Sequence, residues 1–253
     1  MTWDPKAYLD FEDERTRPAG ELLARIHGKS PLHVIDLGCG PGNSTALLAR
    51  RWPKAKLEGL DSSEAMLDQA RRSGVDAAWH SGDIPTWSPN THYDVIFSNA
   101  TIQWIEGQDK LLPRLMSFLS ADGVFAFQVP ANFDEPSHRL MRDVAADGPW
   151  ASKLKDVRNL IRGTAQGYYE ILEPHAASLD IWQTAYLQVL SGADAVFRWV
   201  SATGLRPFVD ALEGAERADF VRDYKARLAL AYPLRASGTV LFPFQRLFVV
   251  ARR

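Results

Sequence analysis

The chain has 253 residues, 46% of them hydrophobic, and a net charge of −2, which suits one α/β domain with an elaboration or two small domains. No apolar stretch approaches the roughly 20 residues of a membrane span, no lysine-rich run favours nucleic acid, and the first residues lack signal-peptide features. The one cysteine, Cys39, excludes an internal disulfide, so we expect a reduced, cytoplasmic protein that binds neither membrane nor nucleic acid.

Residues 1–30 are predicted to be helical, with Pro18 in the first turn of a helix that carries Leu22, Leu23 and Ile26. From residue 33 onward, short apolar runs alternate with helical stretches. The predicted strands are 33–37, 56–60, 77–80, 93–98 and 124–129. The predicted helices are 44–52, 63–72 and 109–119. This alternation predicts a parallel sheet flanked by helices, with its ligand at the carboxyl ends of the strands.

The alternation of short strands and helices ends after Pro130. Helix signals dominate residues 136–178 and 192–232, whereas β-branched and aromatic residues predict strands over 180–190 and 241–252. We expect a single domain over residues 1–253. Its core would comprise about 30–135, 165–190 and 238–253, and its helical cap would come from 1–29, 136–164 and 191–237.

The run Asp36-Leu37-Gly38-Cys39-Gly40-Pro41-Gly42 directly follows the apolar triplet His33-Val34-Ile35, which begins the first predicted strand. Its three glycines let the backbone approach a ligand, and Asn43 and Ser44 are expected to cap the next helix, whose first N–H groups lack helical partners. A dinucleotide fingerprint places its third glycine where this chain has Asn43. The loop therefore favours a nucleoside without pyrophosphate and disfavours a dinucleotide oxidoreductase. Cys39 is expected to contact the ligand through its backbone and not to act as a nucleophile.

Polar residues also follow the next three strands. Asp61 lies where a nucleotide fold places the acid that accepts from ribose hydroxyls, although an ordinary helix cap is the alternative. Asp83 could accept from an exocyclic amine with Ile84 against the ring, or it could belong to a plain turn. The fourth strand ends in Asn99-Ala100-Thr101-Ile102-Gln103-Trp104, and such residues are expected to face a ligand.

Together, the glycine loop, Asp61, Gly82-Asp83-Ile84 and Asp94–Asn99 resemble the class I S-adenosylmethionine-dependent methyltransferases. The resemblance implies a Rossmann-like seven-stranded α/β sheet of order 3-2-1-4-5-7-6, with 241–252 antiparallel. It implies S-adenosylmethionine as co-substrate and no metal, with the loop at its methionine part, Asp61 at its ribose and Asp83 at its adenine. The residues this places at the cofactor are Tyr8, Asp36, Gly38, Cys39, Gly40, Pro41, Gly42, Asn43, Asp61, Ser62, Met66, Gly82, Asp83, Ile84, Asn99, Ala100, Gln103 and Trp104.

Less generic segments extend the resemblance over nearly the whole chain. These are Trp3-Asp4-Pro5 with Tyr8-Leu9, Arg15–Ala19, Pro41–Thr45, Ala100–Trp104, Trp199–Pro207 and Arg246–Arg253. In them the chain is similar to the trans-aconitate 2-methyltransferases. The resemblance implies methyl transfer to one carboxylate of trans-aconitate, giving a monomethyl ester and S-adenosylhomocysteine, by a monomer or weak dimer.

The residues agree with this chemistry. The pKa of a carboxylic acid in water is about 4, so the carboxylate is already a nucleophile at neutral pH and needs no general base. The sequence shows neither a Ser-His-Asp arrangement nor a cluster at metal-ligand spacing. The other carboxylates of the substrate need cations or hydrogen-bond donors. The candidates for the substrate are Arg17, Gln103, Trp104, His138, Arg206 and Arg246, followed by Arg158 and Arg162.

Several alternatives stay open at this point. Trp3, Tyr8, Phe11 and Trp104 could wall the site or be ordinary core aromatics. The acceptor could be another small carboxylic acid or a malonyl thioester. The chain could also bind S-adenosylmethionine without catalysing any reaction.

Overall fold

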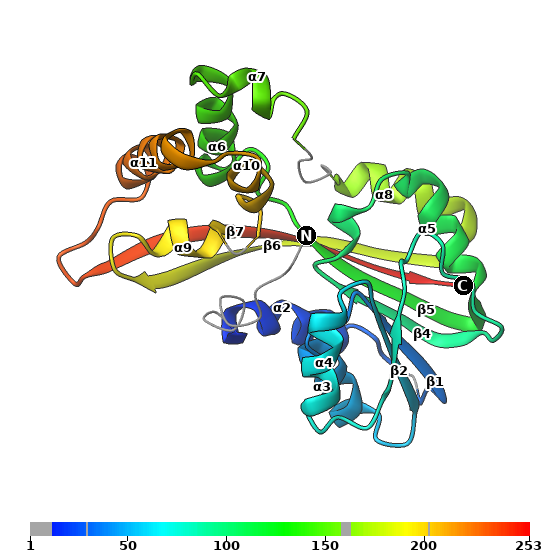
Figure 1. Ribbon diagram of the computed structural model, residues 1–253. Helices are drawn as coiled ribbons and strands as arrows, with labels where there is room; N and C mark the ends of the chain where they lie inside the picture. Colours follow the sequence, from blue (N-terminus) through cyan, green and yellow to red (C-terminus); the bar gives the residue numbers. More distant parts are fainter. Residues whose placement is uncertain (1–11, 29, 158–162, 202) are drawn as a thin grey trace. The chain divides into compact units, whose positions relative to one another are not determined.

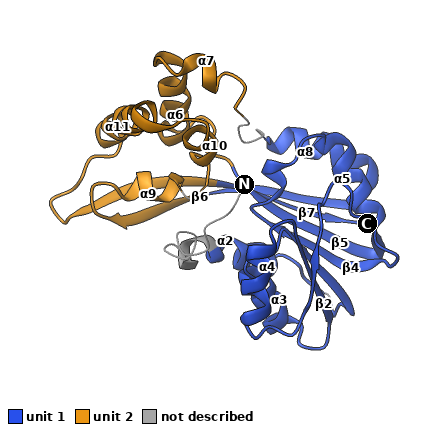
Figure 2. Ribbon diagram, in the orientation of Figure 1, with its two compact units in different colours: residues 1–130, 163–184, 246–253 blue, residues 131–162, 185–245 orange. Residues whose placement is uncertain are grey.

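The computed structural model describes residues 12–28, 30–157, 163–201 and 203–253. The chain divides into two compact units (Figure 2). The first unit comprises Met1–Pro130, Gly163–Thr184 and Arg246–Arg253, and the second comprises Ala131–Arg162 and Ala185–Gln245. Whether the two units act as the single domain expected from the sequence stays a prediction.

One sheet of seven strands has the order β3-β2-β1-β4-β5-β7-β6. Its strands are β1 (His33–Leu37), β2 (Lys56–Asp61), β3 (Ala78–Ser81), β4 (Tyr93–Asn99), β5 (Leu119–Pro130), β6 (Ser178–Ser191) and β7 (Thr239–Arg252). The pairs among β1 to β5 are parallel, and β7 runs antiparallel to β5 (Figure 1). The predicted strand order and the antiparallel seventh strand are confirmed. Residues 34–37 of β1, 95–98 of β4 and 124–129 of β5 are buried without a break and are mostly apolar, as a sheet buried on both faces requires.

The helices of the first unit follow the predicted alternation, with shifts at their ends. They are α2 (Glu12–Ala24), α3 (Asn43–Arg51), α4 (Glu64–Arg72), η1 (Ile102–Trp104), α5 (Gln108–Ser117), α8 (Ala165–Leu172) and η2 (Glu173–His175). The helix α2 packs against α3 and β5, so it belongs to the first unit, whereas residues 1–29 were expected to contribute to the cap.

Two local predictions in this unit are wrong. Pro18 lies inside α2, not in its first turn. Asn43 and Ser44 do not cap α3: the cap position is Gly42, in the left-handed region at φ 95°, and Asn43 is the first helical residue. The hydroxyl of Ser44 is instead used by the buried carboxylate of Asp36.

The second unit is built mainly of helices, as predicted for its part of the chain. They are α6 (Pro136–Asp147), α7 (Ala151–Leu154), α9 (Ala195–Ser201), α10 (Arg206–Asp210) and α11 (Gly214–Ala231). The long helix α11 packs against α6, α9 and α10. Phe220 on α11 lies edge-on to Trp150, and the hydroxyl of Tyr224 donates to the carbonyl of Ser137 over 2.6 Å. This unit therefore has an aromatic core of its own.

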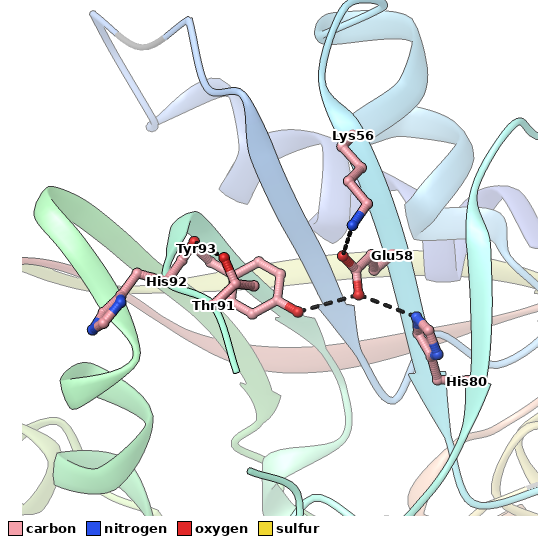
Figure 3. Close-up of polar contacts among 6 residues, drawn as sticks. All are labelled: Lys56, Glu58, His80, Thr91, His92 and Tyr93. Carbon is pink, nitrogen blue, oxygen red and sulfur yellow. Dashed lines mark hydrogen bonds and ion pairs between the residues drawn. The ribbon is translucent and has the colours of Figure 1, made fainter. Parts of the chain in front are cut away.

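A polar cluster ties β2, β3 and β4 together on one face of the sheet (Figure 3). Glu58 accepts from the Tyr93 hydroxyl over 3.2 Å, forms an ion pair with Lys56 at 3.1 Å, and has Nε2 of His80 3.1 Å from its carboxylate. Successive strand residues point to opposite faces, so Glu58 and Asp61 of β2 face opposite ways. The cluster joins three strands on the face of β2 opposite to Asp61.

Candidate functional site

The loop after β1 depends on its glycines. Gly38, Gly40 and Gly42 all have positive φ, at 71°, 53° and 95°. A Cβ on Gly38 would lie 2.2 Å from Oγ1 of Thr101, and one on Gly42 would lie 3.1 Å from the Trp79 ring. A Cβ on Gly40 would meet nothing within 4 Å. Two glycines therefore allow close packing, while the backbone of the third borders open space, where a ligand can approach.

A pocket opens at this loop and is shared with helix α2. Its lining residues are Thr16, Ala19, Gly38, Cys39, Gly40, Pro41, Asn43, Ser44 and Asn99. The structure thus brings together five of the predicted loop residues and Asn99. Thr16 and Ala19 were not predicted as site residues, although they lie in the segment 15–19 that carries part of the family resemblance.

Asp36 lies at the end of β1 with no exposed surface. Its Oδ2 accepts from the hydroxyls of Ser44 and Thr45, each at 2.7 Å, while its Oδ1 has no partner among the described residues. Burial raises the pKa of this carboxyl to about 6, although the two hydroxyl bonds oppose the shift. Asp36 thus anchors the first turn of α3 to the strand, and it does not line the pocket.

The thiol of Cys39 is buried, and burial raises the pKa of this thiol far above its ordinary value. A thiol that stays protonated is a poor nucleophile. This environment agrees with the prediction that Cys39 lends its backbone to the pocket.

Asp61 connects the loop to the end of β2. Its Oδ2 accepts from the backbone N–H of Gly40 over 2.9 Å, and its Oδ1 accepts from the N–H of Ser63 over 2.8 Å. Burial is the main cause that raises the pKa of this carboxyl, while the backbone bonds lower it. Asp61 therefore makes both contacts at once, one with the turn at Ser63 and one with the glycine loop. Each oxygen keeps further acceptor capacity for a ligand hydroxyl.

The other residues predicted near the nucleoside follow β2 and β3. Ser62 and Asp83 are exposed, whereas Met66 and Ile84 are buried. Gly82 lies close to Leu60, whose Cδ1 would be 3.1 Å from an added Cβ. None of these residues lines the pocket at the loop, and their roles stay predictions.

The segment after β4 has an unusual backbone. Ala100 has a backbone φ of 56°, which residues other than glycine rarely adopt. Its carbonyl accepts from Nε2 of Gln103 over 2.6 Å. Gln103 is buried, and its Oε1 has no partner among the described residues. Trp104 is half-buried at the end of η1. Strained backbone of this kind often marks a functional segment.

The predicted substrate residues fall in both units. In the first unit, Arg17 is exposed and bonds Glu21, whereas Arg246 is buried and donates to Gln128. In the second unit, Arg206 lies 4.0 Å from Asp210. His138, also in the second unit, is buried beside the hydroxyl of Ser137; burial lowers the pKa of this imidazole to about 4, so it is neutral at pH 7.

Some predictions lie outside the described residues, namely those on Trp3, Tyr8, Phe11, Arg158 and Arg162. Within the described ranges, no group of three or more His, Cys, Asp or Glu side chains could hold a metal ion. The described helices include none that is long and apolar enough to cross a bilayer.

Comparison with known proteins decides the family. The family described as "Methyltransferase domain" matches residues 34–123. The trans-aconitate 2-methyltransferase of Azoarcus sp. (strain BH72) is 48% identical over 253 residues, which cover 100% of this chain and 99% of that protein. The chain belongs to the trans-aconitate 2-methyltransferase family.

A second family member, from Paracidovorax citrulli (strain AAC00-1), is 49% identical over 256 residues and is matched over 99% of this chain and 98% of its own. Among solved structures, the YcgJ protein of Bacillus subtilis shares the fold, with a TM-score of 0.62 at 13% identity over 94% of this chain and 98% of that one. The resemblance to the trans-aconitate 2-methyltransferases, predicted from segments spread over nearly the whole chain, is thereby confirmed.

Proposed function

We propose that this protein transfers a methyl group from S-adenosylmethionine to one carboxylate of trans-aconitate, giving the monomethyl ester and S-adenosylhomocysteine. The observation that carries the proposal is 48% identity over the whole chain to a trans-aconitate 2-methyltransferase. A methyltransferase fold alone would leave the acceptor open, because one fold serves many substrates.

The residues around the glycine loop fit the co-substrate. The pocket beside Gly40 would take its methionine part, and the carboxylate of Asp61, with acceptor capacity left on both oxygens, would hold the ribose hydroxyls. Asp83, which lies two residues after β3, is exposed and would accept from the adenine amine. Asp36 supports this site indirectly, because its carboxylate holds the hydroxyls of Ser44 and Thr45 in the first turn of α3.

The reaction requires the protein to align the carboxylate with the methyl group and to exclude water from the site. S-adenosylmethionine supplies a methyl group on a positively charged sulfur. A carboxylate oxygen of trans-aconitate forms the new bond to carbon as the bond to sulfur breaks, so a negative and a positive charge are both lost. Water stabilises separated charges and would oppose this step, whereas an enclosed, oriented site favours it. No proton has to be removed, since the acid is ionised at neutral pH.

The remaining carboxylates of the acid require donors. In the first unit the candidates are Arg17, Gln103 and Trp104, together with Arg246, for which a different role is argued below. In the second unit the candidates are His138 and Arg206. The partner is thus a small anionic polycarboxylate. A cytoplasmic location, a monomeric or weakly dimeric state, and the absence of nucleic-acid or membrane partners stay predictions.

Turnover against a panel of acceptors tests the proposal. The full-length protein is incubated with methyl-labelled S-adenosylmethionine and trans-aconitate, other di- and tricarboxylates, or a malonyl thioester, and the esters are identified by mass spectrometry. We expect trans-aconitate to give the highest kcat/KM. A preference for the malonyl thioester would contradict the substrate, and cofactor binding without any ester would indicate a catalytically silent binding protein.

A further inference from the structure

Three polar side chains form a row across neighbouring strands of the first unit: Asn99 on β4, Gln128 on β5 and Arg246 on β7. Asn99 pairs with Gln128, and Arg246 pairs with Pro130, two residues further along β5, so all three side chains leave the sheet on one face. Arg246 Nη1 donates to Oε1 of Gln128 over 3.3 Å, and Gln128 Nε2 donates to Oδ1 of Asn99 over 2.6 Å. Gln128 has no exposed surface, and Arg246 is 5% exposed. This polar row is therefore a buried chain of hydrogen bonds that ends at Asn99.

Chemistry fixes the direction of the polar row. A guanidinium group donates hydrogen bonds and cannot accept them. The amide of Gln128 must therefore turn its oxygen toward Arg246 and its nitrogen toward Asn99. Asn99 must then accept with its oxygen, which leaves its NH₂ group for other partners. An isolated asparagine could present either atom, but in this row the oxygen of Asn99 is turned toward Gln128 and its NH₂ group is turned away from Gln128.

Asn99 lines the pocket at the glycine loop, whereas Arg246 does not. The same pocket is lined by Asn43 and Ser44, in the first turn of α3. The amino end of a helix favours anions because its first N–H groups lack helical partners. A fixed NH₂ donor from Asn99 adds to this preference. The methionine part of S-adenosylmethionine carries one anionic group, a carboxylate, and its oxygens only accept.

We propose that Gln128 and Arg246 are positioning residues that hold Asn99 as a hydrogen-bond donor to the carboxylate of the methionine part of S-adenosylmethionine. The inference rests on the proposed function. In this inference Arg246 orients Asn99 through Gln128 and does not contact trans-aconitate directly. The inference also accounts for Gln128, the one polar side chain in the otherwise apolar run of residues 124–129.

Reversing the direction of the row tests this inference. In Gln128→Glu, the new carboxylate still accepts from Arg246 but cannot donate to Asn99, so the amide of Asn99 must turn its oxygen toward the pocket. Gln128→Met is the matched control, because it removes both hydrogen bonds without reversing their direction. Binding of S-adenosylmethionine and of decarboxylated S-adenosylmethionine, which lacks the carboxylate, is measured by calorimetry on the full-length variants, with thermal unfolding recorded for each.

We expect Gln128→Glu to weaken binding of S-adenosylmethionine about 10- to 100-fold, the usual effect of losing a hydrogen bond to a charged group, and Gln128→Met to weaken it less. Decarboxylated S-adenosylmethionine should lose little affinity in either variant. Equal losses for the two ligands, or a larger loss in Gln128→Met that follows a lower melting temperature, would overturn the inference in favour of a purely structural role.

A second variant keeps the inference falsifiable if Gln128→Glu fails to fold. In Asn99→Asp, one oxygen still accepts from Gln128 and the other presents an acceptor to the pocket, so the same selective loss is expected. A raised KM for trans-aconitate with unchanged affinity for S-adenosylmethionine would show that Asn99 faces the acceptor, which contradicts the inference. Absence of any binding by the unaltered protein would instead contradict the proposed function.

Discussion

The buried carboxylate of Asp36 should make the stability of this protein depend on pH in a predictable direction. It lies under the glycine loop with no exposed surface, accepts two hydroxyl bonds through Oδ2 and has an Oδ1 without a partner among the described residues. Burial disfavours the charged form more than the two bonds favour it. The substitution Asp36→Asn keeps the shape of the side chain and removes the charge.

The size of the effect follows from the shift in pKa. Burial raises the pKa of Asp36 from 3.8 to about 6. A shift of about 2 units corresponds to about 3 kcal/mol at 1.36 kcal/mol per unit. The folded protein holds this proton more tightly than the unfolded chain, so the contribution is fully present below pH 3.8 and is lost as the pH rises through 6. Above that pH, the ionised carboxylate lowers the free energy of unfolding.

Denaturant unfolding of the two proteins at intervals between pH 4 and 7 measures this effect. The other titrating groups are common to both proteins, and the substitution also removes the repulsion between Asp36 and Asp61, so the difference in free energy of unfolding reports the titration of Asp36 together with that repulsion. We expect Asp36→Asn to gain up to about 3 kcal/mol relative to the unaltered protein between pH 4 and 7. A difference that stays constant with pH, or that changes in the opposite direction, would refute the description of Asp36 as a desolvated carboxylate.

Four further substitutions test the site. Asp61→Ala should weaken binding of S-adenosylmethionine at least about 10-fold by calorimetry, because it removes the ribose acceptor and the support of Gly40; unchanged affinity would remove the ribose assignment. Gly38→Ala should cost about 2–4 kcal/mol in denaturant unfolding, because its Cβ would overlap Thr101 at positive φ, whereas Gly40→Ala should cost only about 1 kcal/mol, and equal costs would contradict this geometry. Arg206→Ala should raise the KM for the acid far more than the KM for the cofactor, and the reverse would remove Arg206 from the substrate site.

Much of the fold follows from patterns that lie close together in the sequence. Alternating apolar strands and helices predict the parallel part of the sheet, and the glycine spacing predicts the loop at the end of β1. The prediction for Pro18 is wrong because proline is typical of a first helical turn, while the residues before it continue α2. The cap prediction for Ser44 is wrong because its hydroxyl has a stronger partner in the buried Asp36, eight residues away.

The parts of the site that depend on contacts between distant residues could not be predicted. The pocket takes Thr16 from α2, and only the family resemblance of residues 15–19, not any hydrophobic pattern or spacing, linked this helix to the site. In the polar row, Gln128 bonds one residue that is 29 positions away in the sequence and another that is 118 positions away. A signal for it did exist, because one amide in a buried apolar strand needs a partner, and Gln128 is such a residue. The sequence does not show which partner it finds.

The most direct test of the proposed function is methyl transfer to trans-aconitate itself. The full-length protein is supplied with S-adenosylmethionine carrying an isotopic label on the methyl group and with trans-aconitate at neutral pH. We expect one label per product molecule, in an ester that mild alkali hydrolyses to labelled methanol and unaltered trans-aconitate. Binding of S-adenosylmethionine without any transfer of label to trans-aconitate would contradict the proposed function.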